Sequence, residues 1–129
     1  MVLNIKTLEK QIVYIVDSDH KLQRSLLKLF KLNDLVVEVF DSAEDLLKTK
    51  LRSRAACLIV EVNLPNMDGI SLLEHINNLG LRLPTIVLSS GSDLSEAVRA
   101  MQAEAKDFIE KPFIADTLLK KVLDVINQA

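Results

Sequence analysis

Five short apolar runs recur along this chain, and each precedes a segment with helical spacing of its apolar residues. The runs cover residues 11–16, 35–40, 55–62, 84–88 and 107–110. Strands that alternate with helices in this way are typical of a parallel sheet covered on both faces. The run at 55–62 is apolar almost throughout, as a central strand buried on both faces must be. The sequence therefore predicts a doubly wound α/β fold with five parallel strands and five helices.

Capping residues and apolar periodicity support the predicted helices. Ser42 precedes Asp45 by three residues, and Asp93 precedes Glu96 by the same spacing, so Ser42 and Asp93 are predicted N-caps with acidic partners. In the helix that follows Asp93, Met101 lies on the apolar face, and its ordinary interpretation is a core side chain.

Length and composition limit the classes of function. The chain has 129 residues, 49% of them hydrophobic, which fits one domain over residues 1–129 with an aliphatic core. The net charge is −2 and no block of Lys and Arg occurs, so this segment is not expected to bind nucleic acid directly or to associate with an anionic membrane. No apolar stretch reaches the roughly 18 residues needed to span a bilayer, and Cys57 has no partner for a disulfide. We therefore expect a cytoplasmic location.

Polar residues stand where four of the predicted strands end. Asp17, Ser18 and Asp19 follow the first strand; the third ends at Glu61 with Asn63 close behind, the fourth at Ser89 and Ser90, and the fifth at Lys111. In an open parallel sheet, ligands bind outside the carboxyl ends of the strands. We expect these side chains to converge in one charged crevice.

Several segments in this order resemble the receiver domain of two-component response regulators, from residue 12 to the final helix. They are VYIVD at 13–17, LPNMDG at 64–69, Ser89, and DFIEKPF at 107–113. The resemblance implies a flavodoxin-like strand order of 2-1-3-4-5. The segment at 107–113 is most similar to receivers that precede a helix-turn-helix DNA-binding domain, which implies a role in transcription regulation.

The resemblance also assigns roles to the crevice. In that family, an acidic pair after strand one helps to hold Mg²⁺, and an aspartate ending strand three takes a phosphoryl group from a histidine kinase. A hydroxyl and a lysine contact the phosphate. Asp17 fills the first acidic place, Ser18 the second, Glu61 the acceptor, Ser89 the hydroxyl and Lys111 the lysine. Phe108 matches the aromatic residue that couples phosphorylation to the surface of helix four, strand five and helix five.

Two of these places depart from the family pattern. Glu61 carries its carboxylate roughly 1.5 Å further out than an aspartate would, in a reaction that requires in-line approach to phosphorus. Ser18 removes a charged ligand from a site where Mg²⁺ demands near-ideal octahedral geometry. We expect no metal or other cofactor and no catalytic residue, with Asp17, Asp19 and Glu61 as weak metal candidates. We expect the domain to be a pseudo-receiver that works without phosphorylation, and not an enzyme.

The longer Glu61 could instead reach Lys111 and form the ion pair that an acyl phosphate would otherwise make. That contact would mimic activation; the alternative is a rigid docking module. Either way the expected partners are proteins: an output domain, a histidine kinase, or a second copy bound through helix four, strand five and helix five, with Met101 and Phe108 at the interface. Whether an output domain follows Ala129 is open.

Two other functions remain as alternatives. One is a working phosphoacceptor with an altered site, and the other is a small enzyme on the same scaffold. The sequence offers the enzyme little support, because it has no Gly-rich phosphate loop, no nucleophile elbow and no Cys/His cluster. His20 and His75 are isolated and are expected to face solvent.

One further departure lies before the fifth strand, where the chain reads Ala103-Glu104-Ala105. Receivers commonly place glycine at the position of Glu104. Glycine suits a helix C-terminus that needs a positive φ angle. The sequence leaves two alternatives: Glu104 adopts that strained conformation, or the loop is reshaped.

Overall fold

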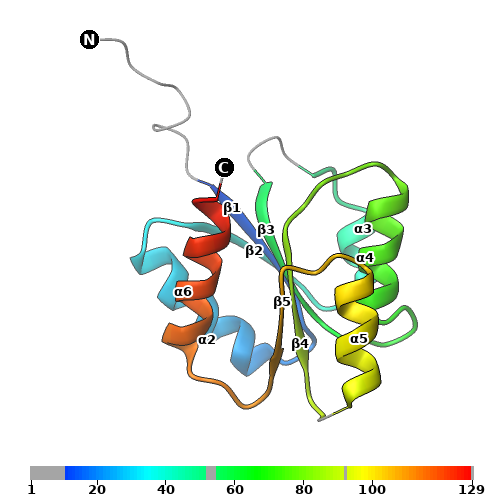
Figure 1. The fold of residues 1–129 in the computed structure, drawn as a ribbon. Coiled ribbons are helices and arrows are strands. Elements are labelled where there is room, and N and C mark those ends of the chain that lie inside the picture. The colour runs from blue at the N-terminus through cyan, green and yellow to red at the C-terminus, as the bar shows by residue number, and fades with distance from the viewer. Residues whose placement is uncertain (1–10, 52–54, 92, 129) are drawn as a thin grey trace.

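The computed structural model describes residues 11–51, 55–91 and 93–128, and it contains a five-stranded parallel sheet (Figure 1). The strand order is β2-β1-β3-β4-β5, which confirms the predicted doubly wound topology. The strands are β1 Ile12–Val16, β2 Val36–Phe40, β3 Ala55–Glu61, β4 Thr85–Ser89 and β5 Asp107–Glu110. Each lies within one residue of the run that predicted it.

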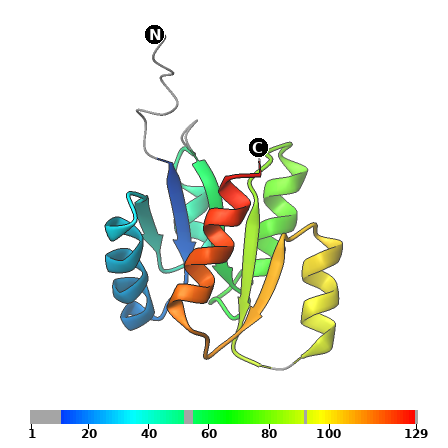
Figure 2. The same ribbon diagram turned by 60° about the vertical axis from the view of Figure 1, so that its left-hand side comes forward.

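In the described part of the chain, five helices cover the two faces of the sheet (Figure 2). They are α2 His20–Leu32, α3 Ala43–Leu47, α4 Gly69–Asn78, α5 Leu94–Gln102 and α6 Ala115–Ile126. Helices α2 and α6 share one face with Val13 and Ile15, while α3, α4 and α5 pack on the face that receives Tyr14 and Val16. Alternate residues of β1 thus enter opposite cores, which is why that strand is apolar throughout. Within the described residues no helix is long and apolar enough to cross a membrane.

The predicted caps begin their helices, but one acidic partner acts elsewhere. Ser42 Oγ accepts the backbone N–H of Asp45 at 3.1 Å, and the Asp93 side chain accepts the N–H of Ser95 at 2.9 Å. Glu96 was expected as the acidic partner beneath Asp93. Its side chain instead contacts Ser89 at the end of β4. The loop before α5 is therefore tied to the sheet.

Met101 is not a core residue, so its ordinary interpretation from sequence was wrong. Its side chain is 52% exposed, and Leu94 and Val98 on the same helix are 77% and 47% exposed. The physical reason is that α5 packs on the sheet through small residues, with Ala100 and Ala103 in the core cluster. The larger apolar side chains are left on the solvent side of α5.

Glu104 adopts a φ angle of 68°, so the chain keeps the usual helix ending and places a strained side chain there. We expect Glu104→Gly to raise the free energy of unfolding by about 1 kcal/mol, because glycine has no Cβ to clash in this conformation. Urea unfolding measures the change. Glu104→Ala is the matched control, since it removes the charge but keeps Cβ; an equal gain from alanine would mean that backbone strain is not the cause.

Candidate functional site

The carboxyl ends of β1, β3 and β5 bring Asp17, Glu61 and Lys111 together. Lys111 Nζ lies 2.7 Å from Asp17 Oδ2 and 2.9 Å from Glu61 Oε2. The carboxylate side chains are 2% and 3% exposed and the lysine 19%. The loops after these strands leave the sheet at one edge, at the bottom in Figure 2. The prediction that Glu61 could reach Lys111 is confirmed.

The two carboxylates determine the charge of Lys111. Burial alone would lower its pKa, but the hydrogen bond to Asp17, the contact with Glu61 and the attraction of both carboxylates outweigh burial. The pKa of Lys111 is raised above its ordinary value of 10.5. The ammonium is therefore fully charged near neutral pH and fixed between two acids.

Glu61 is oriented by groups other than lysine. Its Oε1 accepts a hydrogen bond from Ser90 Oγ at 2.9 Å and the backbone N–H of Asn63 at 3.3 Å. Its Oε2 faces the Lys111 ammonium as an ion pair outside hydrogen-bond geometry. The Asn63 side chain is exposed, so Asn63 serves this site through its main chain.

Ser89, the hydroxyl that the resemblance assigns to the site, does not contact Glu61. Its side chain is fully buried, and Ser89 Oγ lies 2.8 Å from both the Gly91 carbonyl and Glu96 Oε1. Ser90 takes the contact with Glu61 in its place. The sequence places Ser89 and Ser90 together at the end of the fourth strand, but two consecutive serines give no signal of which one turns toward the neighbouring strand.

The side chain of Asp19, the acid next to Ser18, is taken up by contacts with its own neighbours in the chain. Asp19 caps α2, with its Oδ1 accepting the N–H groups of Lys21 and Leu22 at 3.0 and 3.2 Å. Asp17 Oδ1 accepts the N–H of Asp19 at 2.9 Å, and Ser18 is exposed. Within the described part of the chain, no group of three or more His, Cys, Asp or Glu side chains is arranged to hold a metal ion. Both oxygens of Asp17 already have partners, because Oδ1 is bonded to the Asp19 N–H and Oδ2 to Lys111.

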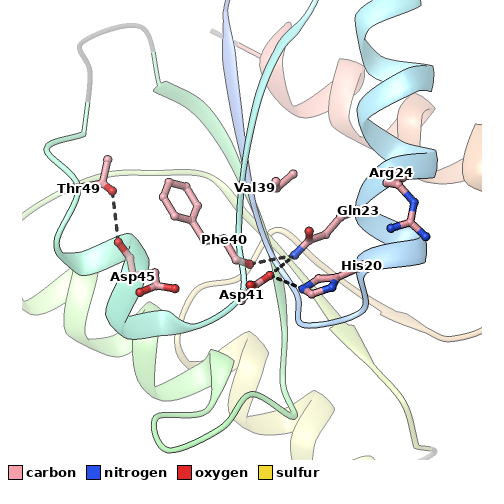
Figure 3. A pocket seen from close by; sticks show the side chains of 8 residues that line it. All are labelled: His20, Gln23, Arg24, Val39, Phe40, Asp41, Asp45 and Thr49. Carbon is pink, nitrogen blue, oxygen red and sulfur yellow. Dashed lines mark hydrogen bonds and ion pairs between the residues drawn. The ribbon is translucent and has the colours of Figure 1, made fainter.

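A separate polar cavity of about 610 Å³ lies at the β2 edge of the sheet, between α2 and α3 (Figure 3). His20 Nε2 contacts Asp41 Oδ1 at 3.0 Å, so His20 faces solvent as predicted but is not isolated. Gln23 donates to Asp41 at 2.8 Å and also to the main-chain carbonyl of Asp17. The hydrogen bond from Gln23, together with His20, lowers the pKa of Asp41 despite the opposing effect of burial. This cavity therefore touches the main chain of the crevice but none of its charged groups.

The sequence that places this lysine between two strand-end acids matches a known family. The model of the response regulator receiver domain matches residues 13–123. The chain belongs to this family. This receiver is also similar in sequence to part of several longer proteins. It is 37% identical over 118 residues to the response regulator protein TodT of Pseudomonas putida, covering 92% of the chain and 52% of TodT.

Other relatives extend the comparison. Nodulation protein W of Bradyrhizobium diazoefficiens is 34% identical, covering 88% of the receiver and 50% of its own length. The transcriptional regulatory protein FixJ of Rhizobium meliloti is 35% identical, covering 87% and 54%. The receiver thus spans about half the length of the curated relatives it matches, of which TodT is named a response regulator and FixJ a transcriptional regulatory protein.

Solved structures agree with this fold. A response regulator receiver protein from Pseudoalteromonas atlantica superposes with a TM-score of 0.85 at 42% identity, covering 90% of this receiver and 97% of that chain. The crystal structure of FixJ-N gives a TM-score of 0.79 at 32% identity, covering 92% and 94%. The two-component receiver fold is therefore established for this chain.

Proposed function

We propose that this receiver works without phosphorylation and acts through contacts with proteins rather than as an enzyme. The observation that carries the proposal is the ion pair of 2.9 Å between Glu61 and Lys111. In the family, lysine makes this contact with the phosphoryl group. Here the acceptor side chain itself fills the place, with its second oxygen bonded to Ser90 and Asn63. Two hydrogen-bond donors hold one oxygen of this carboxylate and an ion pair holds the other, so neither oxygen is aimed at an incoming phosphorus.

The donor set also argues against Mg²⁺. Magnesium needs near-ideal octahedral geometry and oxygen ligands that offset the loss of its water. Asp17 binds the Lys111 ammonium, Ser18 offers no charge, and Asp19 caps α2. A metal would have to displace the lysine from Asp17 or the helix cap from Asp19. We infer that metal binding is weak or absent.

The proposed protein contacts lie on α5 and its neighbours. Leu94, Val98 and Met101 are spaced four and three residues apart, so they form one exposed apolar stripe on α5. Phe108 on β5 is half-buried and packs against the core cluster that also contains Ala100 of α5. Apolar stripes of this kind mark interaction surfaces when they remain exposed. The partner would be an output domain, a histidine kinase or a second copy of the chain.

Phosphoryl uptake tests the proposal directly. Acetyl phosphate with Mg²⁺ is added to the chain and to the double variant Ser18→Asp, Glu61→Asp, and intact mass is recorded with and without hydroxylamine. We expect no change in the mass of the unaltered chain. The double variant should gain one hydroxylamine-sensitive phosphoryl group, because it restores the acidic pair and the shorter acceptor.

The single variants serve as matched controls. Glu61→Asp alone restores the acceptor without its metal ligand, and Ser18→Asp alone restores the ligand without the acceptor. A stoichiometric adduct on Glu61 in the unaltered chain would overturn the proposal and make this receiver a working phosphoacceptor.

A further inference from the structure

The end of β4 carries two adjacent serines whose hydroxyls serve different parts of the molecule. Ser89 Oγ is fully buried beside the Gly91 carbonyl and Glu96, both at 2.8 Å, and it accepts the N–H of Gly91 at 3.2 Å. Ser90 Oγ lies 2.9 Å from Glu61 Oε1. The first hydroxyl ties the start of α5 to the sheet, and the second reaches across to β3.

Ser90 contacts Glu61, the buried carboxylate that pairs with Lys111. A carboxylate that accepts a hydroxyl hydrogen bond makes a strong, charge-assisted contact. With Oε1 held by Ser90 and by the N–H of Asn63, Oε2 is turned toward Lys111 at 2.9 Å. The Ser90 hydroxyl thus orients the Glu61 carboxylate, and this orientation directs Oε2 to the Lys111 ammonium.

The length of the side chain makes this contact specific to glutamate. An aspartate at position 61 would draw its carboxylate back by roughly 1.5 Å. The hydrogen bond of 2.9 Å from Ser90 would then exceed the range of hydrogen bonds. Glutamate at 61 and a hydroxyl at 90 therefore form one unit.

The geometry points to Ser90, and not Ser89, as the positioning residue that holds Glu61 against Lys111. Ser89 belongs to the anchoring of α5 through Glu96. This inference deepens the proposed function, because it names the group that keeps Glu61 where a phosphoryl group would otherwise lie. Its test involves no phosphoryl transfer, so either idea can fail without the other.

Rescue of Glu61→Ala by formate is the first test. Formate supplies a carboxylate without the carbons that would collide with the alanine, and it replaces chloride at constant ionic strength. We expect a saturable rise in the thermal midpoint of Glu61→Ala as formate binds Lys111, Ser90 and Asn63. Adding Ser90→Ala should weaken the apparent affinity for formate about tenfold, the loss expected for one hydrogen bond to a charged group.

Three further variants sharpen this result. Ser89→Ala in the same background should leave the apparent formate affinity unchanged, as should Ser25→Ala on the exposed face of α2. Ser90→Thr keeps a hydroxyl and should restore most of the affinity. Equal weakening by Ser89→Ala, no effect of Ser90→Ala, or a folded Glu61→Ala that formate does not rescue would each overturn the assignment.

A double-mutant cycle gives a second measurement should Glu61→Ala fail to fold. Ser90→Ala should raise the unfolding equilibrium constant about tenfold with Glu61 in place, and should have little effect in Glu61→Asp, where the contact is out of reach. Ser89→Ala should have the same effect in both backgrounds, because its partners are Gly91 and Glu96 and not Glu61. Equal effects of Ser90→Ala in both backgrounds would overturn the inference.

Discussion

Replacing Lys111 with methionine is expected to lower the free energy of unfolding at neutral pH by about 3 to 5 kcal/mol, because the change leaves two buried carboxylates without their cation. Asp17 and Glu61 are 2% and 3% exposed, so water cannot replace the ammonium that lies 2.7 and 2.9 Å from them. Methionine keeps most of the length of the stem, so the loss reports charge rather than packing. Urea unfolding at several pH values measures it.

The matched control is Lys121→Met, the same substitution in an exposed ion pair. Lys121 Nζ lies 2.6 Å from Asp107 Oδ2, but the two side chains are 39% and 37% exposed. Exposed pairs contribute at most about 1 kcal/mol. Similar losses for the two variants would show that the crevice is open to water.

The raised pKa of Lys111 determines how its contribution to the free energy of unfolding changes at high pH. A cation whose pKa rises on folding stabilises the folded state fully below its unfolded value of 10.5, and this stabilisation disappears as pH rises through the higher folded value. The difference in stability between the unaltered chain and Lys111→Met should therefore stay constant through mildly alkaline pH. It should begin to shrink only above about pH 10.5.

The fold could be predicted because its signal repeats along the whole chain. Each parallel strand buried on both faces must be apolar throughout, so β1 and β3 stand out from their helices without knowledge of any contact. Periodicity could not show whether Met101 lies in the core or at the surface. An apolar spacing identifies one face of a helix, but the small Ala100 and Ala103 decide which face meets the sheet.

The charged part of the site could be predicted for a related reason. Parallel strands send their carboxyl ends to one edge, so Asp17, Glu61 and Lys111 could be expected to converge once the strands were assigned. The roles of Ser89 and Ser90 could not be separated in this way. Their directions depend on the loop after β4 and on Glu96 of α5, which claims the first hydroxyl. A contact with a single distant side chain leaves no trace in local spacing.

Gly69 is a second residue whose importance only the structure reveals. Its sequence context, a loop dense in turn residues, suggests backbone freedom as the reason for glycine. The structure gives a different reason, namely close approach. A Cβ built on Gly69 would lie 2.1 Å from the Glu61 carbonyl oxygen and 2.9 Å from Val60 Cγ2, because α4 begins directly against the end of β3. The N–H of Gly69 donates to the Val62 carbonyl at 3.0 Å and fixes this approach.

Gly69→Ala is therefore expected to destabilise the chain by about 3 kcal/mol, at the upper end for overpacking, because the nearest atoms in the way belong to the Glu61 backbone and cannot rotate aside. The added methyl group must push β3 and α4 apart at Glu61. The Glu61 carboxylate would then move relative to Lys111, so the nitrogen resonance of the Lys111 ammonium should shift as well. Urea unfolding and NMR of the folded variant measure the two effects.

Two other glycines separate crowding from backbone strain. Gly91→Ala introduces a Cβ into open space and should change stability by less than about 0.5 kcal/mol. Gly80 also faces open space but has a φ of 78°, so Gly80→Ala should cost about 1 kcal/mol from conformation alone. A loss in Gly69→Ala no larger than that of Gly80→Ala, with the Lys111 resonance in place, would mean that α4 can slide away from β3. In that case the end of β3 does not depend on the tight turn into α4 to hold Glu61 in the crevice.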